Sequence, residues 1–159
     1  MRAIVQRVRG AAVDVGAERV AEIGAGVVVL LGVGANDRPE DGERLGAKVA
    51  ELRIFDDERG RLQRALADIG GVVLAVPQFT LYGDARRGRR PDFTAAADPD
   101  TGRRLFDAFC GVLRGRGLDV RQGRFGATMR VNIDADGPVT IALSTDGWPE
   151  SEVGSRTER

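Results

Sequence analysis

The residue types best suited to chemistry gather at Gln78, Phe79 and Thr80, which follow Pro77 and the continuously apolar residues 72–76. An amide, an aromatic ring and a hydroxyl at the end of a buried strand can be presented together by a loop, as a polar pocket. The same residues also fit ordinary strand continuation, with the ring in the core. Residue types alone leave both interpretations open.

The composition excludes the commonest catalytic machinery. The chain of 159 residues has no histidine, one cysteine (Cys110), and three serines, all close to its end: Ser144, Ser151 and Ser155. Without histidine there can be no Ser-His-Asp or Cys-His pair, and a single cysteine cannot build a thiolate zinc site. Any catalysis must therefore use carboxylates, threonine, amides, arginine, the backbone or the substrate itself.

A basic cluster follows the Gln-Phe-Thr segment. Four arginines occupy five positions: Arg86, Arg87, Arg89 and Arg90. A solvated surface loop is the ordinary interpretation, but arginine also suits phosphate groups, and its closeness to a polar pocket favours that use. The 24 basic and 24 acidic residues give no net charge, which argues against bulk, non-specific nucleic-acid binding but allows a local patch.

Three glycine-containing segments offer further possibilities. Phe125, Gly126, Ala127 and Met129 could accept a flat base by stacking, or could simply form a strand entrance with a packed ring. Gly137-Pro138 indicates a turn and can adopt a cis bond. Gly32-Val33-Gly34 lacks the third glycine of a dinucleotide-binding fingerprint, because position 37 is aspartate, and marks the end of a strand.

The elements that must position these residues form an α+β fold. Short strands are predicted near residues 4–8, 13–15, 18–23, 27–33, 72–76, 129–133 and 139–143, and helices begin near Pro39 and Pro99. We expect mostly antiparallel strands in a barrel-like sheet with about two helices. One domain covers residues 1–145, and residues 146–159 form a polar, loosely ordered tail.

Composition also bears on location. A single cysteine suits a reducing compartment, and no apolar signal core follows the basic first residues. The longest apolar run, residues 27–33, is far shorter than the ~20 residues of a membrane helix. A cytoplasmic protein without membrane association is expected.

Taken together, these segments resemble the D-aminoacyl-tRNA deacylase family, formerly called D-tyrosyl-tRNA deacylases. The resemblance covers roughly residues 1–145. It is carried by five ordered groups of residues: MRAIVQRV at 1–8 with LRIF at 52–55, QFTLYGD at 78–84, GRRP at 88–91, GRFGA at 123–127 and GPVT at 137–140. Each group is weak alone, and their order and spacing together are specific.

The resemblance implies a metal-free, cofactor-free homodimer that hydrolyses the ester joining a D-amino acid, or glycine, to the terminal adenosine of tRNA. It implies active sites at the subunit interface, with Gln78, the backbone N–H of Phe79, and Thr80 around the ester. Gly137 and Pro138 would form a cis pair that enters the partner's site and rejects L-amino acids, with Arg7 holding that loop. Phe125–Met129 would lie near the adenine, and the arginines of residues 86–90 near RNA phosphates.

Two positions depart from the family pattern. Pro77 replaces a serine, with loss of a hydroxyl and a backbone donor, and Ala135 replaces an asparagine near the Gly-Pro pair. Two alternatives therefore stay open: a proofreading esterase with relaxed chirality, and a catalytically weak paralogue that binds the tRNA end. The attacking group is open too, since Thr80 could be the nucleophile or the tRNA 2′-hydroxyl could assist hydrolysis.

Overall fold

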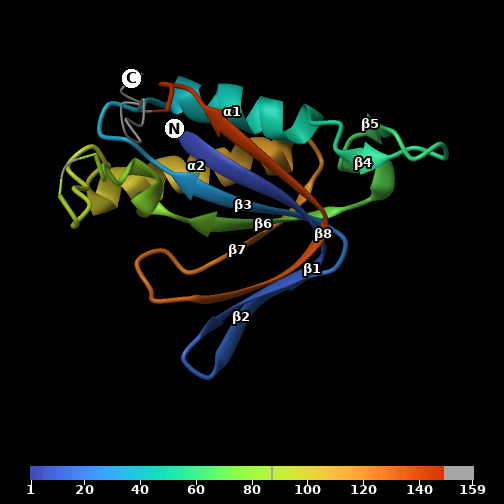
Figure 1. The fold of residues 1–159 in the computed structure, drawn as a ribbon, viewed down its shortest axis with the longest axis horizontal. Helices are drawn as coiled ribbons and strands as arrows, with labels where there is room; N and C mark the ends of the chain where they lie inside the picture. Colours follow the sequence, from blue (N-terminus) through green and yellow to red (C-terminus); the bar gives the residue numbers. More distant parts are fainter. Residues whose placement is uncertain (87, 149–159) are drawn as a thin grey trace, which may run out of the picture.

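A curved six-stranded sheet with two α-helices on one face organises the chain (Figure 1). The computed structural model describes residues 1–86 and 88–148. Two short 3₁₀ helices, η1 and η2, and a small hairpin complete it. The elements are β1 (Arg2–Val15), β2 (Glu18–Ile23), β3 (Gly26–Gly32), α1 (Pro39–Glu51), β4 (Phe55–Asp56), β5 (Leu62–Arg64), η1 (Ala67–Ile69), β6 (Val72–Pro77), η2 (Phe79–Tyr82), α2 (Pro99–Gly115), β7 (Asp119–Gln122) and β8 (Arg130–Ser144).

The sheet is mixed. Its order is β2-β1-β3-β6-β7, with β8 also paired to β1. β1 runs antiparallel to β2, β3 and β8, whereas β3–β6 and β6–β7 are parallel. The α+β class, the barrel-like sheet and the two helices are confirmed, but the expected antiparallel bias misses the parallel pairs. Those pairs arise because α1 and α2 lie in the crossover connections that parallel neighbours require.

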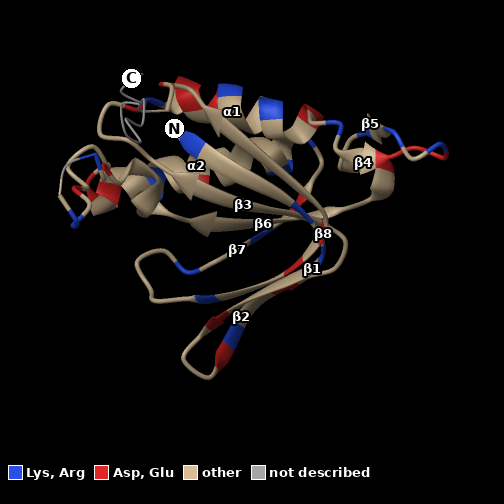
Figure 2. Cartoon of the chain, in the orientation of Figure 1, with Lys and Arg blue, Asp and Glu red and all other residues tan. Residues whose placement is uncertain are grey.

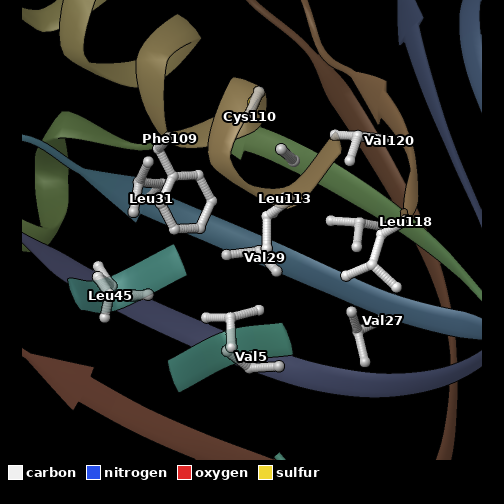
Figure 3. Close-up of a cluster of buried hydrophobic side chains, with 14 of the residues drawn as sticks. Val5, Val27, Val29, Leu31, Leu45, Phe109, Cys110, Leu113, Leu118 and Val120 are labelled. Carbon is white, nitrogen blue, oxygen red and sulfur yellow. The ribbon is translucent and has the colours of Figure 1, made fainter. Parts of the chain in front are cut away.

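The core lies between the helices and one face of the sheet. Alternate residues of β1, including Ala3 and Val5, point to this face and are fully buried. Figure 3 shows the strand side chains Val27, Val29 and Leu31 packed against Phe109 and Leu113 of α2 and Leu45 of α1. A second, smaller cluster fills the opposite face where β1 and β2 curl over β3 and β6. The core therefore fixes the ends of β3 and β6 rigidly.

Both helices begin at the predicted prolines. Asp98 caps α2 by accepting hydrogen bonds from the N–H groups of Asp100 and Thr101, at 3.1 and 3.0 Å, which lowers the pKa of its carboxyl group. Asp37, two residues before α1, does not cap the helix: its carboxylate binds the Met1 amino group at 2.6 Å and the Gly34 N–H at 2.6 Å. Arg38 takes the cap position, and the carboxylate of Asp41 accepts its N–H at 2.9 Å.

The predicted turn at Gly137-Pro138 is wrong, because β8 continues through these residues as one strand from Arg130 to Ser144. β1 and β8 are paired at Gln6–Thr140 and again at Val8–Ala135. Between these two pairs β1 has one residue, Arg7, whereas β8 has four, residues 136–139. The extra residues of β8 therefore form a bulge. The turn-forming sequence is therefore used to build a bulge within a strand. The two closing strands expected around it are halves of one strand.

Charged residues are frequent on α1, the loops and the β1–β2 hairpin, whereas the central strands β3 and β6 contain none (Figure 2). Among the described residues, no helix is long and apolar enough to cross a membrane. Of the predicted tail, residues 149–159 lie outside the described part of the chain.

Candidate active site

A pocket of about 670 Å³ opens where β6 ends, and it brings two of the predicted segments together. Gln78 and Phe79 form one wall, and residues 125–129, from the connection between β7 and β8, form another. The start of α2 closes the third side with Pro99, Gly102 and Phe106. Residues nearly 50 positions apart in the sequence thus share one concave, largely apolar site, the usual form of a small-molecule pocket.

The Gln78 wall begins where the sheet hydrogen bonding stops. The Gln78 N–H donates to the Leu31 carbonyl at 2.8 Å, and the chain then turns into η2. In the described part of the chain, no group accepts a hydrogen bond from the N–H groups of Phe79 or Thr80. These are the first donors of a 3₁₀ turn, which have no partner within the helix. The turn therefore offers two backbone donors near the pocket wall.

The side chains of Gln78, Phe79 and Thr80 are partly or fully exposed. Phe79 is 59% exposed, and its ring meets Phe93 edge to face with 5.2 Å between centroids. The Gln78 Nε2 donates to the Thr80 hydroxyl, although Thr80 is not among the residues that line the pocket. The alternative in which Phe79 continues the strand into the core is therefore wrong.

The opposite wall has a flat apolar surface. The Phe125 ring packs against Phe106 with 6.2 Å between centroids. A Cβ at Gly102 would lie 3.2 Å from the Phe125 Cζ, so the glycine lets the helix approach the ring closely. Gly126 adopts φ of +78°, a conformation that favours glycine and reverses the chain beside the pocket. An aromatic ring beside small residues is a surface on which a flat group can stack.

Arg7 and Gly137-Pro138 lie together, but away from the pocket. Arg7, 7% exposed, donates from Nε to the Asp136 carbonyl at 3.1 Å and from Nη1 to the Ile54 carbonyl at 2.9 Å. The Gly137-Pro138 bond is cis, and both residues are exposed. The path from this pair to Gln78 crosses from β8 through β1 and β3 to β6, three strand spacings of about 4.8 Å each. It also runs several residues along the strands, at about 3.3 Å per residue. The separation within one chain is therefore on the order of 20 Å.

The basic loop leaves the pocket and returns beside it. Asp84 and Asp92 exchange two backbone hydrogen bonds, of 2.7 and 2.9 Å, that close the loop at its base. Arg86, Arg89 and Arg90 are exposed, and none of them lines the pocket. Arg86 pairs with Asp84 at 2.6 Å. Arg87 lies outside the described residues, so the assignment of these arginines to RNA stays a prediction.

A buried polar cluster supports η2 from behind. Arg2 donates to the Leu81 carbonyl at 3.1 Å, and its guanidinium lies 4.2 Å from the centre of the Tyr82 ring. The Tyr82 hydroxyl reaches Asp37 at 3.3 Å, and burial, followed by the charge of Asp37, raises the pKa of Tyr82 well above its usual range. The phenol thus stays neutral and holds the turn in place.

Some residues that line the pocket could not be recognised as site residues from the sequence. Phe93, Ala96 and Gly102 reach the pocket only because the loop before α2 folds back on β3, with the Ala97 N–H donating to Val33 at 2.9 Å. Phe106 belongs to the buried, apolar face of α2, a pattern that indicates a core position but not a site. Within the described residues, no three His, Cys, Asp or Glu side chains are grouped so that they could hold a metal ion.

Known proteins resemble this chain over most of its length. The family model described as D-Tyr-tRNA(Tyr) deacylase matches residues 4–144. A D-aminoacyl-tRNA deacylase of Thermus aquaticus is 51% identical, covering 94% of this chain and 98% of that protein. One from Roseiflexus sp. (strain RS-1) is 54% identical, covering 91% and 94%.

A solved structure titled c-Myc DNA Unwinding Element Binding Protein is also similar, with a TM-score of 0.85 and 38% identity, covering 91% of this chain and 99% of that one. The family match spans both walls of the pocket, Arg7 and the Gly-Pro pair. The chain therefore belongs to the D-Tyr-tRNA(Tyr) deacylase family.

Proposed function

We propose that this protein is a D-aminoacyl-tRNA deacylase, which hydrolyses the ester of D-aminoacyl-tRNA, and of glycine on the wrong tRNA, to free tRNA and amino acid. The observation that carries the proposal is the shared pocket. It sets amide and backbone donors at Gln78 and Phe79 opposite an apolar wall at residues 125–129. An aminoacyl ester on adenosine has the matching parts, a carbonyl group and a flat base. Because the substrate is an aminoacyl-tRNA, we place the reaction in the cytoplasm.

The chemistry needs orientation and anion stabilisation more than a strong base. Water forms a bond to the ester carbonyl carbon, the bond to the ribose oxygen breaks, and a proton from the water passes to that oxygen. The carbonyl oxygen becomes negative on the way, and the N–H of Phe79 would stabilise it. One oxyanion donor contributes about 3–4 kcal/mol to such a transition state. The neighbouring 2′-hydroxyl of the substrate can assist the proton transfer, which explains how the reaction can proceed without histidine.

The surroundings of Thr80 favour hydrolysis by water over a covalent intermediate. Among the described side chains, the one bonded to its hydroxyl is Gln78, whose amide nitrogen donates the hydrogen bond. An amide that donates cannot take the threonine proton, so the hydroxyl lacks the base that an attacking oxygen needs. Thr80 is therefore assigned the role of holding Gln78 toward the substrate.

Selection against L-amino acids is assigned to a second copy of the chain. Gly137 and Pro138 are exposed and lie on the order of 20 Å from Gln78, so they cannot act on the pocket of their own chain. In a homodimer with interface active sites, they would enter the partner's pocket as a rigid backbone wall. Such a wall excludes one enantiomer by steric clash and admits glycine, which has no side chain.

Two alternative functions have specific observations in their favour. Pro77 and Ala135 depart from the family pattern, and relaxed chirality would follow from a weaker Gly-Pro wall. A similar solved structure is titled as a DNA unwinding element binding protein, which favours the alternative of nucleic-acid binding. Retention of Gln78, Thr80 and the Gly-Pro pair supports catalysis over binding alone.

One assay separates the three functions. Purified protein is incubated with matched tRNAs that carry a D-amino acid, its L-form or glycine, and release of the amino acid is followed. We expect cleavage of the D- and glycyl-esters with the L-ester spared. Comparable cleavage of the L-ester would establish relaxed chirality, and binding of tRNA without any release would refute enzymatic function.

A further inference from the structure

A second hollow of about 350 Å³ lies beside the pocket, on the other side of Phe125. Phe106 and Phe125 belong to the lining of both spaces. Its polar groups come from α2 and from the end of β7: Arg103, Asp107, Gln122 and Arg124. A ligand that fills the pocket and continues outward therefore meets this hollow after passing one aromatic ring.

The hollow has a stacking surface formed by a cation and a ring. The Arg103 guanidinium carbon lies 4.8 Å from the centre of the Phe125 ring, and the Arg103 side chain is exposed. No carboxylate of a described residue forms an ion pair with Arg103. Guanidinium planes and aromatic rings are the surfaces on which proteins stack unpaired RNA bases.

The remaining groups favour a base over a phosphate. Gln122 Nε2 donates to the Asp107 Oδ1 at 3.3 Å, which leaves the other carboxylate oxygen of Asp107 able to accept a hydrogen bond. Arg124 is paired with Glu18 at 2.9 Å. Glu18 thus neutralises Arg124, and the other two charged residues of the lining, Arg103 and Asp107, have opposite charges, so the lining has no excess positive charge to attract a phosphate. A carboxylate that accepts from an exocyclic amine is instead the usual recognition of cytosine N4.

We propose that this hollow binds the nucleoside that precedes the terminal adenosine of the tRNA, an inference that rests on the proposed function. Every mature tRNA ends in cytidine, cytidine and adenosine, so this nucleoside is a cytidine. Its base stacks at Arg103 and donates its N4 amine to Asp107, and the Gln122 amide lies beside it. Binding two successive bases on either side of Phe125 aligns the end of the RNA, and with it the ester, in the pocket.

The test compares two substrates that differ in this nucleotide. D-aminoacyl-tRNA contains it, whereas D-aminoacyl-adenosine ends at the sugar and base held in the pocket. We expect Asp107→Ala to lower kcat/KM for the tRNA about tenfold, the loss typical of one base contact, and to leave hydrolysis of the adenosine ester unchanged. On wild-type protein, replacement of the penultimate cytidine by uridine, which lacks the amine, should cause a similar loss that Asp107→Ala abolishes.

Asp100→Ala is the matched control, because Asp100 is an exposed carboxylate on the same helix outside the hollow. Removal of an acidic residue ordinarily favours RNA binding by weakening repulsion. A loss of kcat/KM in Asp107→Ala, but not in Asp100→Ala, therefore cannot come from the change in net charge. Equal effects of Asp107→Ala on both substrates, or equal rates with cytidine and uridine on wild-type protein, would overturn the inference. Failure of wild-type protein to hydrolyse either substrate would instead overturn the proposed function.

Discussion

Arg7 connects its own strand, β1, to the β4 segment and to β8 through one buried side chain. Its guanidinium reaches the Ile54 carbonyl at 2.9 Å, the Asp136 carbonyl at 3.1 Å and the Asp56 carboxylate at 3.3 Å. A Cβ on Gly137 would lie 3.0 Å from Arg7 Nη2, so the bulge and the side chain fit closely. The planar, five-donor fork of arginine satisfies acceptors in several directions at once in a fixed geometry.

We predict that Arg7→Lys weakens discrimination between enantiomers more than it weakens catalysis. The lysine keeps the charge but loses at least one of the two bonds to backbone carbonyls, at a cost of about 1–3 kcal/mol in stability. The bulge would then be less firmly held, and the ratio of D- to L-ester hydrolysis should fall about tenfold.

Arg9→Ala is the control for Arg7→Lys, because Arg9 binds the same residue, at the Asp136 carboxylate at 3.2 Å, from a side chain that is 75% exposed. This variant should keep wild-type discrimination. A D-to-L ratio that is unchanged by Arg7→Lys would contradict the assigned role of Arg7.

Thr80 provides a second prediction at the residue scale. If the hydroxyl only holds Gln78, Thr80→Ala removes one neutral hydrogen bond, worth about 1 kcal/mol, and turnover should fall about fivefold. If the hydroxyl attacks the ester, the loss should exceed about a thousandfold, as for other lost nucleophiles. Single-turnover hydrolysis of D-aminoacyl-tRNA distinguishes these cases, with Thr80→Ser as the variant that preserves the hydroxyl.

Among the elements, the contact between α1 and α2 depends on one glycine. A Cβ at Gly46 would lie 2.8 Å from the Val112 Cγ1, so the helices approach closely at this point. The start of α2 forms a wall of the pocket, and its position on the sheet is therefore set partly by this contact. A small residue on α1 thus affects the shape of a site to which it does not contribute.

We predict that Gly46→Ala destabilises the protein by about 1–3 kcal/mol through overpacking, despite the better helix propensity of alanine. Gly111→Ala on α2 is the control, since a Cβ there meets nothing within 4 Å. That variant should gain roughly 0.5–1 kcal/mol. Urea denaturation at equilibrium measures both, and equal effects at the two positions would contradict the close approach of the helices.

The elements also show what the sequence could and could not predict. Pro39 and Pro99 marked the helix starts correctly, because proline at the first turn and a capping side chain act within a few residues. The role of Asp37 depends on the Met1 amino group, which reaches it only after folding. The parallel pairing of β6 depends on both crossovers, and the bulge at Gly137 depends on its alignment with Arg7.

The same distinction applies to the site. Gln78-Phe79 and residues 125–129 could be identified from residue types and resemblance, and the structure brings them into one pocket. Phe93 and Gly102 could not be identified in this way. Phe93 reaches the pocket because of how its loop folds, and Gly102 contributes because it has no side chain. The separation of Gly137-Pro138 from that pocket is a property of the sheet order, which no local pattern encodes.

For the whole molecule, we predict a homodimer whose sites are shared between chains. Sedimentation equilibrium should give the mass of two chains. A Gly137→Ala chain, strained because Gly137 has φ of +120°, should hydrolyse L-esters. An excess of Gln78→Ala chain, whose own pocket lacks the side-chain amide and is expected to be inactive, should then restore discrimination, because each mixed dimer has one site with both native segments.

The restoration requires exchange of subunits, so the mixture is prepared by unfolding and refolding the two chains together. Wild-type protein treated in the same way is the control for recovery. If the mixture hydrolyses L-esters as fast as the Gly137→Ala chain alone, each site is built from a single chain and the shared-site arrangement is wrong.

The pairing of β1 with β8 has a consequence for how the protein is made. The two strands join residues at opposite ends of the chain, with Arg2 opposite Ser144. At a synthesis rate of about 5–20 residues per second, translation of β8 is completed on the order of ten seconds after translation of β1. During that time one edge of β1 has no strand to cover it, and the sheet is completed only when β8 has been synthesised.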